Sequence, residues 1–306
     1  MKKNIKITVF TPTYNRNKLL KRCKESLDAQ TCKNFEWLIV DDGSTDGTRS
    51  VVKEFSKNSN YHIKYIFQEN SGKYIAHNTA VKNCATDYLL ILDSDDILSP
   101  VAIEILYKKI NEINSNQKIA GIIGNRGDFQ THKIIGTKLP KNIQYTTGLQ
   151  LYQRYKFKGD TLRMYKTDIL KKYLFPIIQN ESFIPENVVF DQIDKRYQLL
   201  AIPEVIYFTE YQQEGYSKNI CKIRHNNPIG YSYSLKSAAE TAVVFRKKIN
   251  WTILYIIWCK NFKIKNFNTF RHKVLYILLY PISMILNWAN KPSFLFKSIK
   301  GINNEE

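Results

Sequence analysis

The first hundred residues alternate between short apolar runs and segments with helical spacing, and this alternation constrains the fold more than any other feature. The apolar runs lie at Ile5–Thr11, Phe35–Val40, His62–Phe67 and Tyr88–Leu92. Helical patterns separate them, at Lys18–Ala29, Thr48–Phe55 and Lys73–Cys84. Strands that are apolar throughout and alternate with helices are typical of a parallel sheet covered on both faces. The sequence therefore predicts an α/β fold.

Polar loops follow three of these strands, at Thr11–Arg16, Asp41–Thr48 and Asp93–Asp96. In open α/β sheets, ligands bind outside the carboxyl ends of the strands. We therefore expect the three loops to lie at one edge of the sheet and to form a binding site there.

The loop Asp93–Asp96 holds three carboxylates within four residues. Mg²⁺ prefers oxygen ligands and is commonly held by one or two carboxylates plus substrate phosphates. The same segment also suits a helix N-cap at Ser94 or Asp96. The residues alone leave both interpretations open.

The other loops suit a nucleotide but also have simpler explanations. Asp41-Asp42-Gly43-Ser44 suits a ribose or a base, and equally a tight turn. Tyr14 suits base stacking and Arg16 a phosphate or an acid, although both fit an ordinary loop before a helix. Asn70-Ser71-Gly72-Lys73 opens a helix and suits a diphosphate. Neither P-loop nor GxGxxG spacing occurs, which argues against a P-loop protein and a dinucleotide dehydrogenase.

Taken together, these elements resemble the family 2 glycosyltransferases. The matching segments are Thr11-Pro12-Thr13-Tyr14-Asn15-Arg16, Asp41-Asp42-Gly43-Ser44-Thr45-Asp46-Gly47-Thr48, Asn70-Ser71-Gly72 with Asn78, and Asp93-Ser94-Asp95-Asp96. The resemblance is close over residues 5–100 and thins beyond them. It implies a GT-A fold, which is a Rossmann-like mixed sheet flanked by helices. It also implies a nucleotide-diphosphate sugar donor, most commonly with uridine, inversion at the anomeric carbon, and Mn²⁺ or Mg²⁺ as cofactor.

The resemblance also implies roles for individual residues. The donor would be bound by Thr11, Pro12, Tyr14, Arg16, Asp42, Asn70, Gly72, Lys73, Asn78, Asp93 and Ser94. Asp95 would be the direct metal ligand, and Asp93 would contact the ribose or donor sugar or assist with the metal. Glu186 is the best match to the general base, with Asp191 and Asp194 as rivals because the usual Glu-Asp pair is absent. An acid in the first turn of a helix, stabilised by the helix dipole, is the alternative for Glu186.

The second half of the chain gives weaker signals. Strands are expected at Ile119–Ile123, Lys133–Gly136 and Leu199–Tyr207, and helices at Lys166–Tyr173, Glu186–Tyr197 and Ser232–Lys248. Asp160 and Arg163 precede one of these helices and are predicted to border the acceptor. We expect a catalytic domain over 1–220, with a nucleotide-sugar half at 1–100 and an acceptor half at 101–220. A helical region follows over 221–306.

The C-terminal region is strongly basic. The chain has a formal net charge of +19, and Lys218–Lys300 holds 15 Lys and Arg against one acid, Glu240. The run Val274–Ala289 has 16 residues without a charge and contains Pro281, whereas a membrane span needs about 20. Arg271, Lys273 and Lys291 flank the run, which predicts shallow attachment to an anionic membrane surface. The alternative is a core helix packed on the catalytic domain.

These features together predict the transfer of one sugar per encounter to a saccharide or lipid-linked saccharide in bacterial surface polysaccharide synthesis. The QxxRW element of processive relatives is replaced by Gln212-Gln213-Glu214-Gly215-Tyr216. The five cysteines lack CxxC spacing and the first apolar run is broken by Lys6 and Thr8, so we expect a cytoplasmic protein without a signal peptide, peripheral on the inner face of the plasma membrane.

Two other classes of protein agree less well with the sequence. A sugar nucleotidyltransferase is the nearest enzyme alternative, but its glycine-rich loop is missing from Thr11–Arg16. A nucleic-acid-binding protein is the alternative from the charge, but the acids at 41–46 and 93–96 would repel phosphate in the absence of a metal, so no nucleic acid is expected as a partner.

Overall fold

The computed structural model describes residues 6–210, 216–265 and 267–289. Its main sheet is built from β1 Ile7–Thr13, β2 Phe35–Asp41, β3 His62–Phe67, β4 Tyr88–Ile91, β6 Ile119–Asn125, β8 Tyr145–Thr146, β9 Thr161–Lys166 and β10 Gln198–Ile202. The strand order is β3-β2-β1-β4-β9-β6-β10-β8. A second, three-stranded sheet holds β5 Ile97–Leu98, β11 Tyr207–Thr209 and β7 Gly127–Asp128.

The first four strands are parallel, and β9 is antiparallel to both of its neighbours, β4 and β6. Two antiparallel pairings in succession make β6 run in the same direction as β4. The carboxyl ends of β1, β2, β4 and β6 therefore lie at the same edge of the sheet, where ligands bind in folds of this kind.

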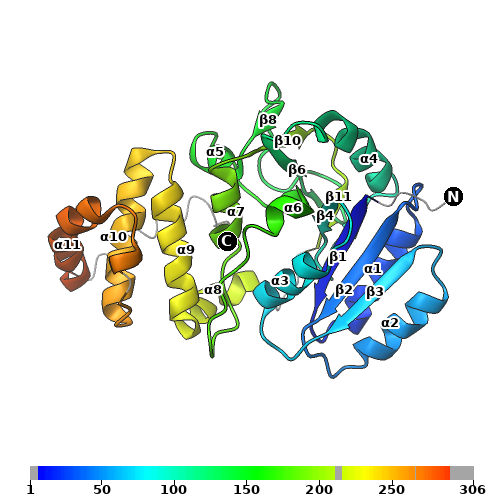
Figure 1. Ribbon diagram of the computed structural model, residues 1–306, viewed down its shortest axis with the longest axis horizontal. Helices are drawn as coiled ribbons and strands as arrows, with labels where there is room; N and C mark the ends of the chain where they lie inside the picture. The colour runs from blue at the N-terminus through cyan, green and yellow to red at the C-terminus, as the bar shows by residue number, and fades with distance from the viewer. Residues whose placement is uncertain (1–5, 211–215, 266, 290–306) are drawn as a thin grey trace.

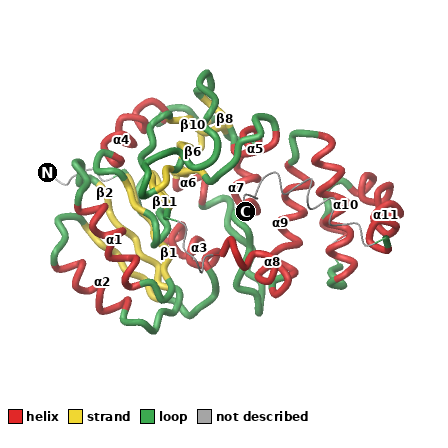
Figure 2. The backbone as a smooth tube through the Cα atoms, turned by 180° about the vertical axis from the view of Figure 1, so that it is seen from behind, coloured by secondary structure: helices red, strands yellow, loops and turns green. Residues whose placement is uncertain are grey.

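Helices cover both faces of the sheet (Figures 1 and 2). One face carries α1 Asn17–Asp28, α2 Thr48–Lys57 and α4 Ala102–Ile113, and the other carries α3 Lys73–Asn83, α5 Gly148–Gln153, α6 Thr167–Leu170 and α7 Asn187–Asp194. Successive residues of a strand point to opposite faces, so Val9 packs with the first group and Phe10 with the second. Both faces are apolar, which explains why these strands are apolar throughout.

The strands and helices expected in the first hundred residues are confirmed, but three expectations between residues 101 and 210 are wrong. At Lys133–Gly136 there is only an isolated bridge between Ile134 and Gly127. Of the helix expected at Lys166–Tyr173, only α6 is helical, because Lys166 belongs to the central strand β9. The strand expected at Leu199–Tyr207 is divided into β10 and β11, and Pro203, which has no N–H to donate, lies in the interruption.

The C-terminal part is helical. It holds α8 Tyr216–Asn226, α9 Pro228–Thr241, α10 Phe245–Asn261, the short 3₁₀ helix η1 Phe267–Thr269 and α11 Lys273–Trp288. Helices α9, α10 and α11 lie in a row at the end of the molecule away from β1–β3, and α8 lies between α9 and α3 (Figures 1 and 2). α9 packs between α7 and α10, and α10 packs on α11. The single helix expected at Ser232–Lys248 is wrong, since Ala242 leaves the helical conformation (φ −52°, ψ 126°) and ends α9.

The apolar run of α11 packs on its neighbours along only part of its surface. Leu279 and Ser283 are buried, whereas most of its large apolar side chains are exposed. Over the part of the chain that the structure describes, no helix combines the length and hydropathy needed to cross a membrane. The division of the chain after residue 220 stays a prediction.

Candidate active site at the carboxyl edge of the sheet

The loops that follow β1 and β2 are joined by hydrogen bonds. The backbone N–H of Asn15 donates to Ser44 Oγ at 2.9 Å, and the N–H of Thr45 donates to Asn15 Oδ1 at 2.8 Å. Asn15 takes a left-handed conformation, with φ 51°, which asparagine tolerates better than most residues. The N–H of Asn17 donates to Asp46 Oδ2 at 3.0 Å. The predicted meeting of these two loops at the sheet edge is therefore confirmed.

Asp42 joins the loop after β2 to the start of α3. Its Oδ1 accepts hydrogen bonds from Gln68 Nε2 at 2.7 Å and from the N–H of Ser71 at 2.9 Å. Its Oδ2 accepts from the N–H of Gly72 at 2.8 Å. The carboxylate is 5% exposed, so it rigidly sets the position of the Asn70–Lys73 segment.

Lys73, the first residue of α3, connects two carboxylates that are distant in sequence. Its Nζ lies 2.7 Å from Asp93 Oδ1 and 3.0 Å from Glu186 Oε1. Asp93 follows β4 and Glu186 precedes α7. Burial alone would lower the pKa of Lys73, but the two carboxylates outweigh it and raise that pKa.

Glu186 is an accessible and ionised carboxylate. Its side chain is 54% exposed. The charge of Lys73 lowers its pKa, which burial alone would raise. The pKa of Asp93 is also lowered, because Lys73 and Arg126 together outweigh the opposing effect of burial. Both acids therefore carry a negative charge at neutral pH.

The acidic loop after β4 is held by two side chains that the sequence analysis did not single out. Arg126 Nη1 lies 3.2 Å from Asp96 Oδ2. The hydroxyl of Tyr207 donates to Asp96 Oδ2 at 2.6 Å and accepts from the N–H of Asp93 at 3.1 Å. Burial raises the pKa of Asp96 to about 7, against the effect of Arg126. At the other end of the loop, Arg16 Nη1 pairs with Asp95 Oδ2 at 2.8 Å.

The position of Arg126 directly after an apolar strand could have indicated a site residue. Arg126 directly follows β6, a strand that is buried throughout, and β6 ends at the same edge as β4. Tyr207 had no local signal, because it begins a three-residue strand far along the chain. Its ring lies 4.3 Å from the guanidinium carbon of Arg126, so the two residues support the acidic loop together.

Several predicted donor ligands are fixed by contacts inside the protein. Thr11 Oγ1 is buried and accepts from Trp37 Nε1 at 2.9 Å. The amide of Asn78 is buried and exchanges two hydrogen bonds of 2.9 Å with the backbone of Phe175. Pro12 and Ser94 are also buried, whereas Tyr14 and Asn70 are exposed. The donor-binding roles of these residues stay predictions.

The two rival bases are placed differently from Glu186. Asp194 is 7% exposed, and its Oδ2 accepts from the N–H of Leu149 at 3.1 Å. Burial raises its pKa to about 6, although Arg163 opposes this. Asp191 accepts from Asn187 Nδ2 at 3.2 Å, and burial raises its pKa to about 7. In the described structure, Lys73 connects Asp93 to Glu186. Within that part of the chain, it forms no ion pair with either rival.

The two residues predicted on the acceptor side lie in different surroundings. Asp160 is exposed. Burial would lower the pKa of Arg126, but surrounding groups, Asp160 among them, raise it. Arg163 instead donates to Tyr165 Oη at 3.0 Å. Over the described residues, no group of three or more His, Cys, Asp or Glu side chains forms a ready metal site.

The arrangement resembles solved structures of nucleotide-sugar enzymes. The crystal structure of S. aureus TarS 1-349 in complex with UDP-GlcNAc matches with a TM-score of 0.59 at 18% identity, covering 94% of this chain and 88% of that one. The mixed sheet, its flanking helices and the acidic loops at its edge define a GT-A type fold, as predicted.

The sequence comparisons place the chain in a family. Residues 8–174 match the family model of Glycosyl transferase family 2. Glycosyltransferase GlyG of Streptococcus pneumoniae serotype 4 is 36% identical over 253 residues, which cover 81% of each chain. Glycosyltransferase GlyA of the same organism is 34% identical over 182 residues, covering 56% of this chain and 26% of GlyA. The protein belongs to glycosyl transferase family 2, and the predicted resemblance is confirmed. The chain spans about a quarter of the length of GlyA.

Proposed function

We propose that the protein transfers a single sugar from a UDP-sugar to a hydroxyl of a saccharide or lipid-linked saccharide, with inversion at the anomeric carbon. The observation that carries this proposal is the position of Lys73 between Asp93 and Glu186. Through Lys73, the predicted donor-binding residue Asp93 and the predicted base Glu186 contact the same cation. The UDP-GlcNAc bound by TarS, which shares the fold, supports a UDP-sugar donor.

Glu186 acts as the general base in this proposal. Its carboxylate takes the proton of the acceptor hydroxyl while that oxygen bonds to the anomeric carbon and the bond from this carbon to the diphosphate breaks. The exposed, ionised state of Glu186 suits proton transfer, which requires hydrogen-bond reach. A donor diphosphate competes with Glu186 for Lys73, and loss of that ion pair makes Glu186 a stronger base.

Arg16 and Lys73 are the cations nearest to the leaving diphosphate in this proposal. Both pair with carboxylates of the acidic loop, so they already point at this edge. Asp95, with Asp93, would hold Mn²⁺ or Mg²⁺. Both carboxylates offer hard oxygen ligands and already face cations, and donor phosphates would complete the coordination of such an ion. A bound ion would supply Lewis-acid neutralisation of the leaving group.

Nucleotide binding and turnover test this proposal separately. UDP should raise the melting temperature with Mn²⁺ present, and Asp95→Ala should abolish the rise. Glu186→Gln should keep the UDP-dependent rise and lose turnover by roughly 10²–10⁴-fold. Asp191→Asn is the matched control and should retain turnover. If Glu186→Gln stays active while Asp191→Asn does not, the base is Asp191.

We further propose that the acceptor belongs to bacterial surface polysaccharide synthesis and is reached at the inner face of the plasma membrane. The exposed apolar residues of α11 and the basic C-terminal region support attachment to an anionic membrane surface. Lys291 and the Gln212–Gly215 segment, which also entered these predictions, lie outside the described residues.

A further inference from the structure

A cleft lies between the catalytic part of the chain and the C-terminal helices, beside the direct packing of α9 on α7. It has a volume of about 420 Å³ and is walled by residues of α5, α7, α9 and α10 and by the segment before α11. Its lining includes four basic side chains, from Lys195, Lys248, Arg271 and His272. They come from three separate stretches of the chain, so the fold itself gathers them.

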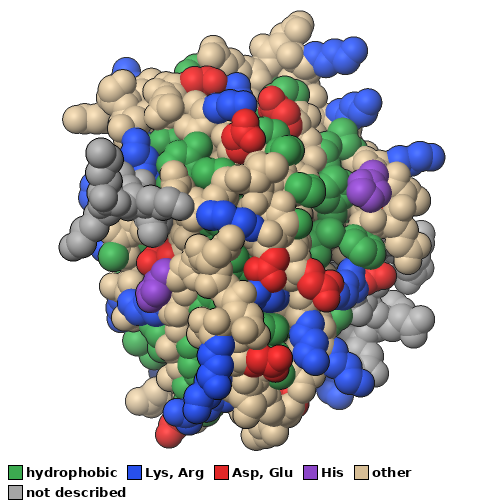
Figure 3. Space-filling view, turned by 90° about the vertical axis from the view of Figure 1, so that its right-hand side faces the viewer, with side chains coloured by type: hydrophobic (Ala, Val, Ile, Leu, Met, Phe, Trp, Pro, Cys, Tyr) green, Lys and Arg blue, Asp and Glu red, His purple; other side chains and the backbone are tan. Residues whose placement is uncertain are grey.

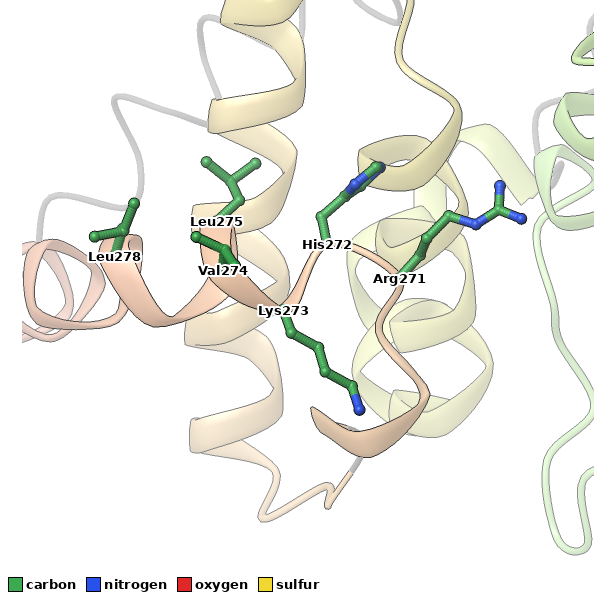
Figure 4. A pocket seen from close by; sticks show the side chains of 6 residues that line it. All are labelled: Arg271, His272, Lys273, Val274, Leu275 and Leu278. Atoms are coloured by element: carbon green, nitrogen blue, oxygen red, sulfur yellow. The ribbon is translucent and has the colours of Figure 1, made fainter.

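A second cavity, of about 500 Å³, begins where the first one ends. Arg271 and His272 line both cavities. The second one continues along Val274, Leu275 and Leu278 at the start of α11 (Figure 4). In Figure 4 the Arg271 side chain extends away from these apolar residues. The two cavities therefore form a basic end joined to an apolar wall.

Two carboxylates line the cleft beside its basic side chains, but in the part of the chain that the structure describes they form no ion pair with them. Within the described residues, none of Lys195, Lys248 and Arg271 takes part in an ion pair. Glu240 lines the cleft, but its Oε1 accepts from the backbone N–H of Arg271 at 2.7 Å. Asp194 also lines it and binds the N–H of Leu149. Three Lys and Arg side chains against these two carboxylates leave the cleft with a net positive charge.

The titration behaviour of the cleft agrees with this excess. Burial, followed by the charge of Arg271, lowers the pKa of Lys195. Burial, followed by the charge of Lys248, lowers the pKa of His272. His272 therefore favours its neutral form, with Nε2 at 3.5 Å from Lys248 Nζ, whereas Lys195 and Arg271 repel each other, and a bound anion would relieve that repulsion.

The surface beside the cleft is apolar. Val274, Leu278, Ile285 and Trp288 are exposed by 72%, 66%, 65% and 89%. Their spacing of three, four and seven residues places them along one side of α11. An amphipathic helix with such a side lies in the interface of a membrane, with its apolar side toward the acyl chains.

We propose that this cleft binds the phosphate headgroup of an anionic lipid, with the exposed side of α11 in contact with the acyl chains. The inference deepens the membrane attachment of the proposed function and rests on it. It assigns the headgroup to Lys195, Lys248 and Arg271, and it places the lipid next to α7, the helix that follows Glu186. The same membrane contact would thus orient the acceptor side toward the bilayer.

The test compares two charge-matched double variants in vesicle flotation. Lys195→Gln/Lys248→Gln removes two charges from the cleft. Lys53→Gln/Lys57→Gln removes two exposed charges from α2, at the other end of the molecule, where basic and acidic side chains are interspersed (Figure 3). Vesicles are phosphatidylcholine with or without phosphatidylglycerol.

We expect binding that depends on phosphatidylglycerol and that falls about fivefold per cleft charge, hence roughly twenty-five-fold in the cleft variant. The α2 variant should change by less than about twofold, since screening limits distant charges. Arg271→Gln, tested separately, should weaken vesicle binding about fivefold. The test therefore does not depend on the folding of a single variant. Equal losses in the cleft and α2 variants would overturn the proposal, because net charge alone would then explain binding.

Two further arms separate the alternatives. If inorganic phosphate raises the melting temperature of the wild type but not of the cleft variant, while phosphatidylglycerol adds nothing to vesicle binding, the cleft takes free phosphate and the lipid assignment is wrong. UDP-sugar hydrolysis in vesicle-free buffer reports on the active site alone. The cleft proposal is overturned if the wild type hydrolyses UDP-sugar but does not bind vesicles. The proposed function is overturned instead if the wild type binds vesicles but neither hydrolyses UDP-sugar nor is stabilised by UDP.

Discussion

Replacing Gly72 with alanine should damage both stability and catalysis, and a second glycine provides the control. Gly72 has a φ of +94°, and a Cβ built on it would lie 1.8 Å from the carbonyl oxygen of Ser182. Gly47 has a similar φ of +85°, but a Cβ there would meet nothing within 4 Å. Gly47 is left-handed, with ψ 8°, whereas Gly72 has ψ 155° in a region that essentially only glycine occupies, so alanine at Gly72 adds a stricter backbone restriction and a steric clash.

The magnitudes follow from these two geometries. A left-handed conformation costs an L-residue about 1–2 kcal/mol, so Gly47→Ala should lower the free energy of unfolding by that amount. Gly72→Ala carries a backbone cost of about 1–3 kcal/mol, because φ 94° with ψ 155° is a region that essentially only glycine occupies. It must also move Ser182 by more than an ångström, although Asn227 Oδ1 holds the N–H of Ser182 at 2.8 Å. Overpacking of this kind costs a further 1–3 kcal/mol or so.

The loss of activity should exceed what instability explains. Ser182 lies four residues before Glu186, so a shift of its backbone moves the proposed base. A misplacement of about 1 Å can cost roughly 10²-fold in rate. Urea unfolding and sugar transfer at a temperature where both variants remain folded measure the two effects. Equal free energies and equal rates for Gly72→Ala and Gly47→Ala would refute the reasoning.

Two further predictions concern buried carboxylates. Tyr207→Phe should lower the free energy of unfolding by about 2 kcal/mol, because buried Asp96 loses a donor, while the same change at exposed Tyr155 should cost almost nothing in urea unfolding. Asp194 has a pKa of about 6 in the folded protein and about 4 when unfolded. The folded state therefore binds this proton more tightly, and the free energy of unfolding of the wild type falls as pH rises between those values. Asp194→Asn should therefore gain stability relative to wild type over this range, by at most about 3 kcal/mol, and remain level above it. Asp87→Asn, at an exposed position, should show no such trend in unfolding at several pH values.

The sheet edge was predictable because strand direction and strand order decide most of its geometry. Apolar runs between polar loops indicated parallel strands, and parallel strands bring their carboxyl ends together. The contact between Asn15 and Ser44 realises this expectation. No knowledge of side-chain positions was needed, since the loops follow neighbouring strands that pair along their whole length.

The parts that escaped prediction depend on contacts between distant segments. Nothing in Thr161–Lys166 reveals that β9 inserts antiparallel between β4 and β6. That insertion carries the end of β6, and so Arg126, to the acidic loop. Tyr207 and Asp96 are 111 residues apart. The sequence also indicated a phosphate-binding role for Lys73 without showing that it bridges two acids.

Charge balance at this edge explains why a divalent cation suits the proposed reaction. Within the described residues, ion pairs join three cations and four carboxylates, which are Arg16, Lys73 and Arg126 with Asp93, Asp95, Asp96 and Glu186. With Asp96 partly protonated, because its pKa is about 7, the group is close to neutral before a donor arrives. A nucleotide diphosphate adds negative charge that these cations can meet only by leaving their carboxylates. A divalent ion beside Asp95 would supply the missing charge and let Lys73 turn from Glu186 to the diphosphate, so donor binding and activation of the base would be one event.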